Sequence, residues 1–181
     1  MGSPEPDKIE PTIMPNPSAL SRDPAFIEFA HQMLGDSEMA DGLTPEQLAH
    51  VAAVGEMRSF EGGKLICDEH ERSDELYIIE AGIVEVWLDP SSIGDENSEQ
   101  RKIASLQAGQ TCGELALLDG GVRSAQLRAG SHGAKLMAFH RRDLLALCEA
   151  DTVIGYRIMR NLAGALALRL RLQDMRLYSS E

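Results

Sequence analysis

Cysteines, aromatic residues and long apolar runs are scarce in this chain of 181 residues. The three cysteines, Cys67, Cys112 and Cys148, lie far apart and outside any C-x-x-C spacing, so we predict buried, unreactive thiols and neither a disulfide framework nor a structural zinc site. No apolar stretch approaches the ~18 residues that a membrane helix needs. The N-terminus also has no apolar segment after a basic start, as a secretory signal would. We therefore expect a cytoplasmic protein.

Positive charge is scarce as well, since 17 Lys and Arg residues stand against 29 Asp and Glu, a formal net charge of -12. Nucleic-acid binding needs a basic surface that displaces phosphate counterions, so we expect no nucleic-acid partner. We also expect no helix-turn-helix, because only a few residues of the sequence, up to Glu181, follow the last predicted helix. Five arginines make that helix locally basic, and we expect them to form a solvated face or to pair with the acidic body: Arg157, Arg160, Arg169, Arg171 and Arg176.

The chain divides into a Pro-rich segment, residues 1–22, which we expect to be a flexible tail, and one domain over residues 23–181. Two helices are predicted at the start of the domain. The first is capped by Asp23, and its inward residues are Phe26, Ile27, Ala30, Met33 and Leu34. The second begins at "TPEQLAHVAAV", where Thr44 and Gln47 form a capping box.

Short strand-like segments separated by Gly, Asp and Ser fill residues 56 to 139. Within Ile83–Leu88, Val84, Val86 and Leu88 share one face, while Glu85 and Trp87 share the other. This spacing predicts a mainly β fold, an antiparallel jelly-roll (double-stranded β-helix) barrel with flanking helices. Residues 89–100 are polar and predict a solvated hairpin loop.

Two further helices are expected over about residues 141–178. "RRDLLALCEA" predicts a short helix, and Asp151 or Thr152 caps a long one that runs to about Leu177. The long helix carries two apolar stripes: Leu162, Leu166, Leu170 and Leu177; and Ile158, Ala165, Leu168, Leu172 and Met175, interrupted by Asn161. A helix at the edge of one barrel needs a single stripe, so the second predicts a partner such as another copy of the chain. The alternative is that both stripes pack on the barrel.

Motifs for catalysis are missing: the chain has no nucleophile elbow, no P-loop lysine motif and no paired-acid signature, so we predict that it is not an enzyme. Barrels of this kind also occur in metal-binding cupins, and "HERSDELYIIEAG" offers His70 and Glu75 as ligands. Arg72, however, stands where an H-x-H pair needs its second histidine, and metal sites take three or more convergent ligands. A cupin site is therefore disfavoured, and no metal or cofactor is expected.

The stretch "CGELALLDGGVRSA", residues 112–125, combines features that suit an anionic ligand. Gly113 lets the backbone approach a ligand closely, and a helical turn at 114–117 would present unpaired N–H groups. Arg123 returns to the same place with a planar fork that suits two phosphate oxygens, and Ser124 adds a hydroxyl donor. Glu114 cannot face a phosphate, so its natural partner is a sugar hydroxyl. Together these groups describe a cyclic nucleotide; the alternative is that Glu114 and Arg123 form an ordinary exposed ion pair.

This stretch resembles the phosphate-binding cassette of the cyclic nucleotide-binding domain, the module of catabolite activator protein and protein kinase A regulatory subunits. The matching positions are Gly113, Glu114, Leu115, Ala116, Leu117, Arg123, Ser124 and Ala125, and the likeness extends over about residues 43 to 175. The resemblance implies that Glu114 binds the ribose 2′-hydroxyl and Arg123 the cyclic phosphate. It further implies that amides around Leu115, Ala116 and Ala125 complete the cradle, and that the long C-terminal helix closes over the base as a lid.

Three positions depart from the family pattern. Cys112 stands where Phe is usual, Val122 where Pro is common, and His70 at a turn position that is more often Gly. The first two change the packing behind the loop and leave the ligand-facing groups intact. His70 belongs to a turn that is remote in sequence from the cassette.

The resemblance implies a stand-alone receptor in second-messenger signalling, with cAMP or cGMP as ligand. Ser124 in place of Thr is similar to cassettes that do not favour cGMP, which points to cAMP. Ligand would move the C-terminal helix and so alter contact with a protein partner or a second copy in a homodimer. Two alternatives remain open at this point: a receptor for a cyclic dinucleotide, and a nucleotide-independent scaffold of the same fold.

Overall fold

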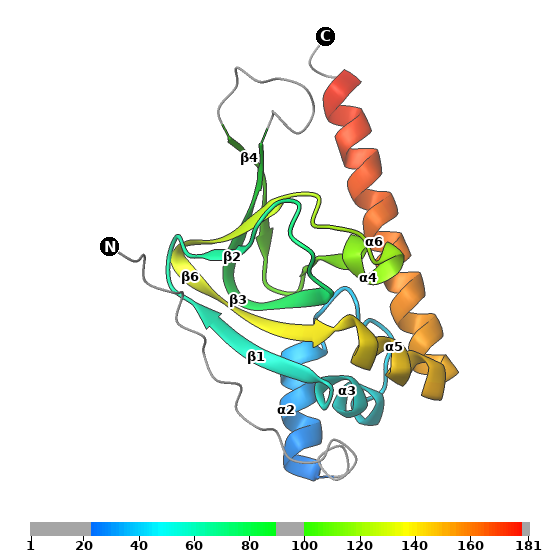
Figure 1. The fold of residues 1–181 in the computed structure, drawn as a ribbon. Coiled ribbons are helices and arrows are strands. Elements are labelled where there is room, and N and C mark those ends of the chain that lie inside the picture. The colour runs from blue at the N-terminus through cyan, green and yellow to red at the C-terminus, as the bar shows by residue number, and fades with distance from the viewer. Residues whose placement is uncertain (1–22, 90–99, 179–181) are drawn as a thin grey trace.

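A computed structural model describes residues 23–89 and 100–178 (Figure 1). The predicted tail at 1–22 and residues 90–99 of the predicted hairpin loop lie outside these ranges. The helices are α2 (Pro24–Leu34), α3 (Pro45–Ala52), α4 (Glu114–Asp119), α5 (Arg141–Ala150) and α6 (Thr152–Tyr178). The strands are β1 (Gly55–Phe60), β2 (Leu65–Cys67), β3 (Glu75–Leu88), β4 (Arg101–Gln107), β5 (Thr111–Cys112) and β6 (Gln126–His140). No helix in the described ranges has the length and hydropathy to span a membrane.

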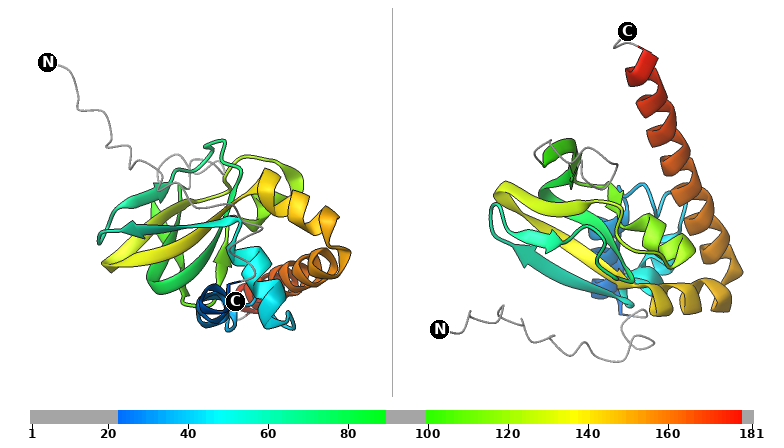
Figure 2. Two further views of the ribbon diagram at one scale, coloured as in Figure 1. Left: turned by 90° about the horizontal axis from the view of Figure 1, so that it is seen from below. Right: turned by 45° about the horizontal axis from the view of Figure 1, so that its top comes forward.

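The strands form one antiparallel sheet in the order β1-β6-β3-β4, with β2 paired to β6 and β5 paired to β3. The predicted mainly β roll with flanking helices is therefore confirmed. Within residues 23–89 and 100–178 the sheet is curled but does not close into a barrel. The helices gather at one end and along one side of the roll (Figure 2).

Two pairs of segments that read as separate strands are continuous in the structure. β3 contains both "LYIIE" and "IVEVWL", and β6 contains both "QLRA" and "AKLMAFH". The chain bends where Gly82 (φ 81°) lies beside Gly133 (φ 84°), and the pairing of β3 with β6 shifts register on both sides of Gly82. Glycines break the apolar pattern in sequence, but here they carry a bend inside a strand.

Buried side chains from both faces of β3 and β6 build two apolar clusters. Leu76 and Ile78 pack against the helices, while Tyr77 and Ile79 point into the roll. β6 repeats the pattern, since Met137 and Phe139 belong to the first cluster and Leu136 and Ala138 to the second. Successive side chains of a strand point to opposite faces, so a strand buried on both faces must be apolar throughout.

The helix caps follow the predicted local chemistry. The Asp23 carboxylate accepts from the amide of Ala25, and Thr44 and Gln47 exchange both bonds of a capping box. Asp151 is the cap of α6, because its Oδ1 accepts from the amides of Val153 and Ile154. The three cysteines are free and buried as predicted, and burial raises the pKa of each thiol.

Helix α6 is packed along its first half and exposed along its second. Ile154, Ile158 and Leu162 are fully buried, whereas four apolar residues further on are 43–60% exposed: Leu168, Leu170, Leu172 and Met175. Both predicted stripes are therefore buried at their start and exposed further on, and a partner for the second stripe stays a prediction. The burial divides along the length of the helix, because its C-terminal half extends past the roll (Figures 1 and 2).

Candidate functional site

Gly113 and Arg123 fit closely together at the start of α4. Gly113 has φ 84°, and a Cβ added there would lie 2.2 Å from Nη1 of Arg123 and 2.7 Å from the carbonyl oxygen of Glu75. Both the backbone conformation and the space therefore require glycine. The guanidinium packs directly against the cassette backbone, so the two ends of the predicted motif meet.

Arg123 is held in a fixed position from several sides, and its side chain is buried, with 3% exposed. Its amide donates to the carbonyl of Glu71 at 3.0 Å, and its carbonyl accepts from the amide of His70 at 2.9 Å. Nη2 donates to the hydroxyl of Ser73 at 2.7 Å, and the guanidinium carbon lies 5.2 Å from the ring centre of Tyr77. A cation over an aromatic ring is electrostatically favourable.

Two of the three guanidinium nitrogens, Nε and Nη1, are buried without a hydrogen-bond partner in the part of the chain that the structure describes. Buried donors are normally paired, because an unmade bond costs about 1–3 kcal/mol. A guanidinium that keeps unused donors can bind an oxyanion through charge-assisted hydrogen bonds. Arg123 is therefore the principal candidate ligand-binding group.

Glu75 is connected to the Arg123 site through Tyr77, whose ring contacts the guanidinium and whose hydroxyl donates to Glu75. Glu75 accepts from Nη1 and Nη2 of Arg58 at 2.9 and 2.6 Å, and from the hydroxyl of Tyr77 at 2.6 Å. Burial raises the pKa of Glu75, but the hydrogen bonds from Arg58 and Tyr77 outweigh it, and the net pKa is lowered. The pKa of Tyr77 is raised by burial and by the adjacent carboxylate. Glu75 thus acts as an anchor, and the described residues hold no cluster of three His, Cys, Asp or Glu side chains fit for a metal.

Glu114, at the first position of α4, is 7% exposed and faces α6. Its Oε1 accepts a hydrogen bond from Nη1 of Arg169, and Nη2 of the same arginine bonds to Glu38. Nη2 also lies 2.9 Å from the carbonyl oxygen of Thr111. Glu114 and Arg123 are both buried and, within the described ranges, do not pair with each other. The alternative of an ordinary exposed ion pair between them is therefore wrong.

The remaining cassette positions differ in exposure. Leu115 is 44% exposed, Ser124 is exposed and Ala125 is half-buried. Ala116 lies within α4, but its side chain is outside the described set. Cys112, in the position where Phe is usual, is buried behind the loop, and Val122 is 45% exposed.

Sequence reasoning missed four residues of this site: Ser73, Tyr77, Glu38 and Arg169. Two signals were available. Tyr77 follows Glu75 by two positions in a strand, which places both on one face. His70 stands at a turn position that is more often Gly; it has φ 65°, and its amide donates to the carbonyl of Arg123.

The comparisons with known proteins agree with this geometry. The family model for the cyclic nucleotide-binding domain matches residues 57–151, more than half of the chain. The cyclic AMP receptor protein of Thermus thermophilus is 32% identical over 141 residues, which are 78% of this chain and 61% of that protein. This chain therefore spans less than two thirds of that relative.

Solved structures show the same fold. The catabolite activator protein of Thermus thermophilus superposes with a TM-score of 0.66 and 31% identity, over 78% of this chain and 62% of that one. A cyclic nucleotide-binding domain from Methylobacillus flagellatus gives a TM-score of 0.75 at 21% identity, over 86% and 85% of the two chains. From the matched residues and the cassette geometry together, this chain belongs to the cyclic nucleotide-binding domain family.

Proposed function

We propose that this protein is a cytoplasmic receptor for a cyclic nucleotide, cAMP in preference to cGMP, and that it acts by binding and not by catalysis. The observation that carries the proposal is the buried guanidinium of Arg123, with Nε and Nη1 unpaired. A cyclic phosphate offers two equatorial oxygens as acceptors for these donors. The Thermus relative named as a cyclic AMP receptor supports cAMP as the first ligand to test.

The other cassette residues have matching roles in this proposal. Glu114 accepts the ribose 2′-hydroxyl, and Ser124 donates its hydroxyl to the phosphate. The amides of Leu115, Ala116 and Ala125 complete the cradle around the anion. Gly113 contributes by keeping the space beside Arg123 clear of a side chain.

The signal would leave the domain through α6. Its C-terminal half carries exposed apolar side chains, so a shift of this helix changes the surface that a protein partner or a second copy of the chain contacts. Ligand that binds one position of α6 better than another shifts the population toward that position. The proposed output is therefore a change in protein–protein contact.

Calorimetric titration with cAMP, cGMP and cyclic dinucleotides tests the ligand. Heat with cAMP at micromolar concentration supports the proposal, and a response to a cyclic dinucleotide alone would redirect it. If none of these ligands gives heat at high micromolar concentration, the nucleotide-independent scaffold becomes the better interpretation.

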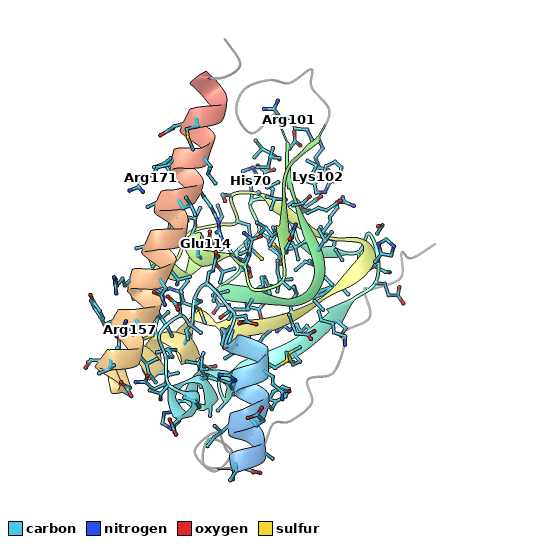
Figure 3. All side chains as sticks on the ribbon, turned by 180° about the vertical axis from the view of Figure 1, so that it is seen from behind. His70, Arg101, Lys102, Glu114, Arg157 and Arg171 are labelled. Carbon is cyan, nitrogen blue, oxygen red and sulfur yellow. The ribbon has the colours of Figure 1, made fainter. Side chains whose placement is uncertain are left out.

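Substitution of Arg123 by Ala tests the site itself. Loss of a buried, charged contact with phosphate should weaken binding by about 2–4 kcal/mol. The matched control is Arg101→Ala, which removes an exposed arginine from β4, far from the cassette (Figure 3). Equal affinity of the Arg123→Ala variant and the wild type would show that the ligand binds elsewhere.

A further inference from the structure

An open cavity outside the cassette lies between α6 and the segment that connects α2 to α3. It has a volume of about 690 Å³; one wall comes from residues within 35–41, and the other comes from α6. Binding sites for small organic molecules commonly have volumes of about 300–1,000 Å³. None of the described residues among 112–125 belongs to its walls, so the cavity is separate from the proposed nucleotide site.

The two walls are joined by hydrogen bonds, and the space between them is not filled by side chains. Asn161 of α6 donates from Nδ2 to the carbonyl oxygens of Met39 and Asp41 at 3.0 and 2.9 Å. Further along α6, Gly164 belongs to the wall, and a Cβ added there would meet no atom within 4 Å. Leu168, which is 55% exposed, forms an apolar end. The cavity therefore has room for an apolar group near Leu168.

Arg157 and Arg160 bring two positive charges to the α6 wall. They lie three positions apart and so share one face of the helix. The guanidinium of Arg157 packs against Gly42, where an added Cβ would lie 3.2 Å from Nη1. Within residues 23–89 and 100–178, neither guanidinium forms an ion pair or a hydrogen bond, although the chain carries a net charge of -12. Two unpaired guanidiniums on one face suit a carboxylate, which accepts hydrogen bonds at both oxygens.

Asp36 and Asp41 bring two negative charges to the opposite wall. Both residues are exposed, and among the described residues neither carboxylate forms an ion pair or a hydrogen bond. The third acidic residue there, Glu38, is already bonded to Arg169 and Thr111. A ligand with negative charge alone would be repelled by the aspartates, and one with positive charge alone by the arginines. A ligand that carries both charges would have a partner for each.

A polar group in the same wall is also unpaired. Ser37 is 3% exposed, and in the described part of the chain its hydroxyl has no hydrogen-bond partner. Buried hydroxyls are normally hydrogen-bonded, so Ser37 keeps an unused donor beside the cavity. The walls therefore combine charged groups of both signs with a further polar group.

We propose that this cavity is a second binding site, for a zwitterionic amino acid with an aliphatic side chain. The two arginines bind its carboxylate, the two aspartates accept from its ammonium group, and its side chain packs toward Leu168. The stretch of α6 from Arg157 to Leu168 spans about 16 Å, which is long enough for such a ligand. This inference goes beyond the proposed function and does not depend on it. Figure 3 shows Arg157 toward the start of α6 and Arg171, which is outside the cavity walls, toward its end.

Calorimetric titration of the full chain with L-leucine, in the absence of cyclic nucleotide, tests the ligand class. Leucine should give saturable heat at millimolar concentration. Two analogues separate its charges: 4-methylpentanoate lacks the ammonium group, and 3-methylbutylamine lacks the carboxylate. Each analogue should bind about tenfold more weakly than leucine, because hydrogen bonds to charged groups are lost.

Three variants test the position of the site. Arg157→Gln and Asp41→Asn should each weaken leucine binding about tenfold. Gly164→Leu should abolish it, because the new side chain fills the cavity. Leucine favours a helix more than glycine does, so this variant carries the test if a charge variant does not fold. Arg171→Gln is the matched control, since Arg171 is exposed on the same helix outside the walls, and it should bind leucine as the wild type does.

The absence of saturable heat with leucine would overturn this inference. Equal affinity for 4-methylpentanoate and leucine would also overturn it, because the site would then take an anion alone. Unchanged binding by Gly164→Leu would do the same, because the ligand would then lie elsewhere. These titrations contain no cyclic nucleotide, so a failure of cAMP to bind would count against the proposed function and leave this inference intact.

Discussion

At the scale of single residues, the site is built around one glycine and one arginine that share the same space. Gly113 leaves room for Nη1 of Arg123, and Tyr77 and Ser73 fix the guanidinium from the other side. The arginine is therefore oriented before any ligand arrives, and two of its donors are left over. Such preorganisation reduces the entropy that must be lost on binding.

Substitution of Gly113 by Ala should damage both stability and ligand binding. Its φ of 84° alone costs about 1–3 kcal/mol with a side chain, and the new Cβ would also displace Arg123. Gly63→Ala is the matched control, since Gly63 has φ 75° but open space around its Cβ. Urea unfolding should show a loss in both variants, whereas calorimetry should show weaker binding for Gly113→Ala alone. Equal binding by the two variants would contradict the close fit.

Glu75 should make stability depend on acid pH. Its pKa lies below the ordinary value of 4.5, so its contribution is complete above that value and is lost as the pH falls through the lowered pKa. We expect Glu75→Gln to lack this component and to show a flatter decline in unfolding free energy between about pH 5 and pH 3. Tyr77→Phe removes one of the bonds that lower the pKa and should give an intermediate slope. Parallel curves for wild type and Glu75→Gln would rule this role out.

At the scale of elements, α6 is hydrogen-bonded to the segment between α2 and α3 at two positions along its length. Asn161 donates from Nδ2 to the carbonyls of Met39 and Asp41 at 3.0 and 2.9 Å, and Arg169 binds Glu38 about two turns further on. These two residues lie about 80° apart around the helix axis, because eight positions make about 2.2 turns. The polar interruption in the apolar stripe at Asn161 is thus a fixed attachment point.

Substitution of Asn161 by Ala should destabilise the fold by about 1–3 kcal/mol, because it removes the donor that both carbonyls use. Arg160→Ala is the control, since Arg160 is exposed one position earlier and should change stability by less than about 0.5 kcal/mol. Thermal and urea unfolding measure both. A loss no larger than that of the control would mean that water replaces the amide without penalty.

Local chemistry in the sequence was enough to predict several elements. Asp23 and Thr44 indicate where α2 and α3 begin, because a helix cap depends only on residues within one turn. The alternation of Val84 and Val86 with Glu85 and Trp87 was also confirmed, as the indole nitrogen of Trp87 donates to Glu85 at 3.1 Å. Glu114 and Arg123 could be singled out from the sequence for the same reason, because the motif that contains them is local.

Features that depend on distant parts of the chain could not be predicted. The continuity of β3 through Gly82 requires the backbone of Gly133, with which it has close contact. The pairing of Arg169 with Glu114 requires the final path of α6, so the sequence left open whether these arginines form a solvated face or pair with the acidic body. The division of α6 into a buried and an exposed half likewise follows from where the roll ends.

At the scale of the whole molecule, two apolar clusters share the same strands. β3 and β6 each contribute alternate side chains to the helical cluster and to the interior of the roll. The exposed half of α6 lies outside both clusters, with Leu168, Leu172 and Met175 spaced to form one face. Exposed apolar residues that share a face are typical of a protein-binding surface.

We expect this face to support a homodimer. In sedimentation equilibrium, Leu172→Glu should shift the wild-type dimer toward monomer, because a charge would be buried in the contact. Ile103→Glu is the control: Ile103 is 38% exposed on β4, away from α6, and should leave the mass unchanged. A monomeric wild type at high micromolar concentration would contradict the homodimer and favour a different protein as the partner of this face.

The unpaired N–H groups of Arg123 also affect which buffer suits binding measurements. A buried guanidinium with unpaired donors can bind any small tetrahedral oxyanion that reaches it. Sulfate or phosphate from a purification buffer would then raise the melting temperature by mass action and compete with an added nucleotide. Affinities measured in Tris–chloride should therefore exceed those measured in phosphate buffer at equal ionic strength.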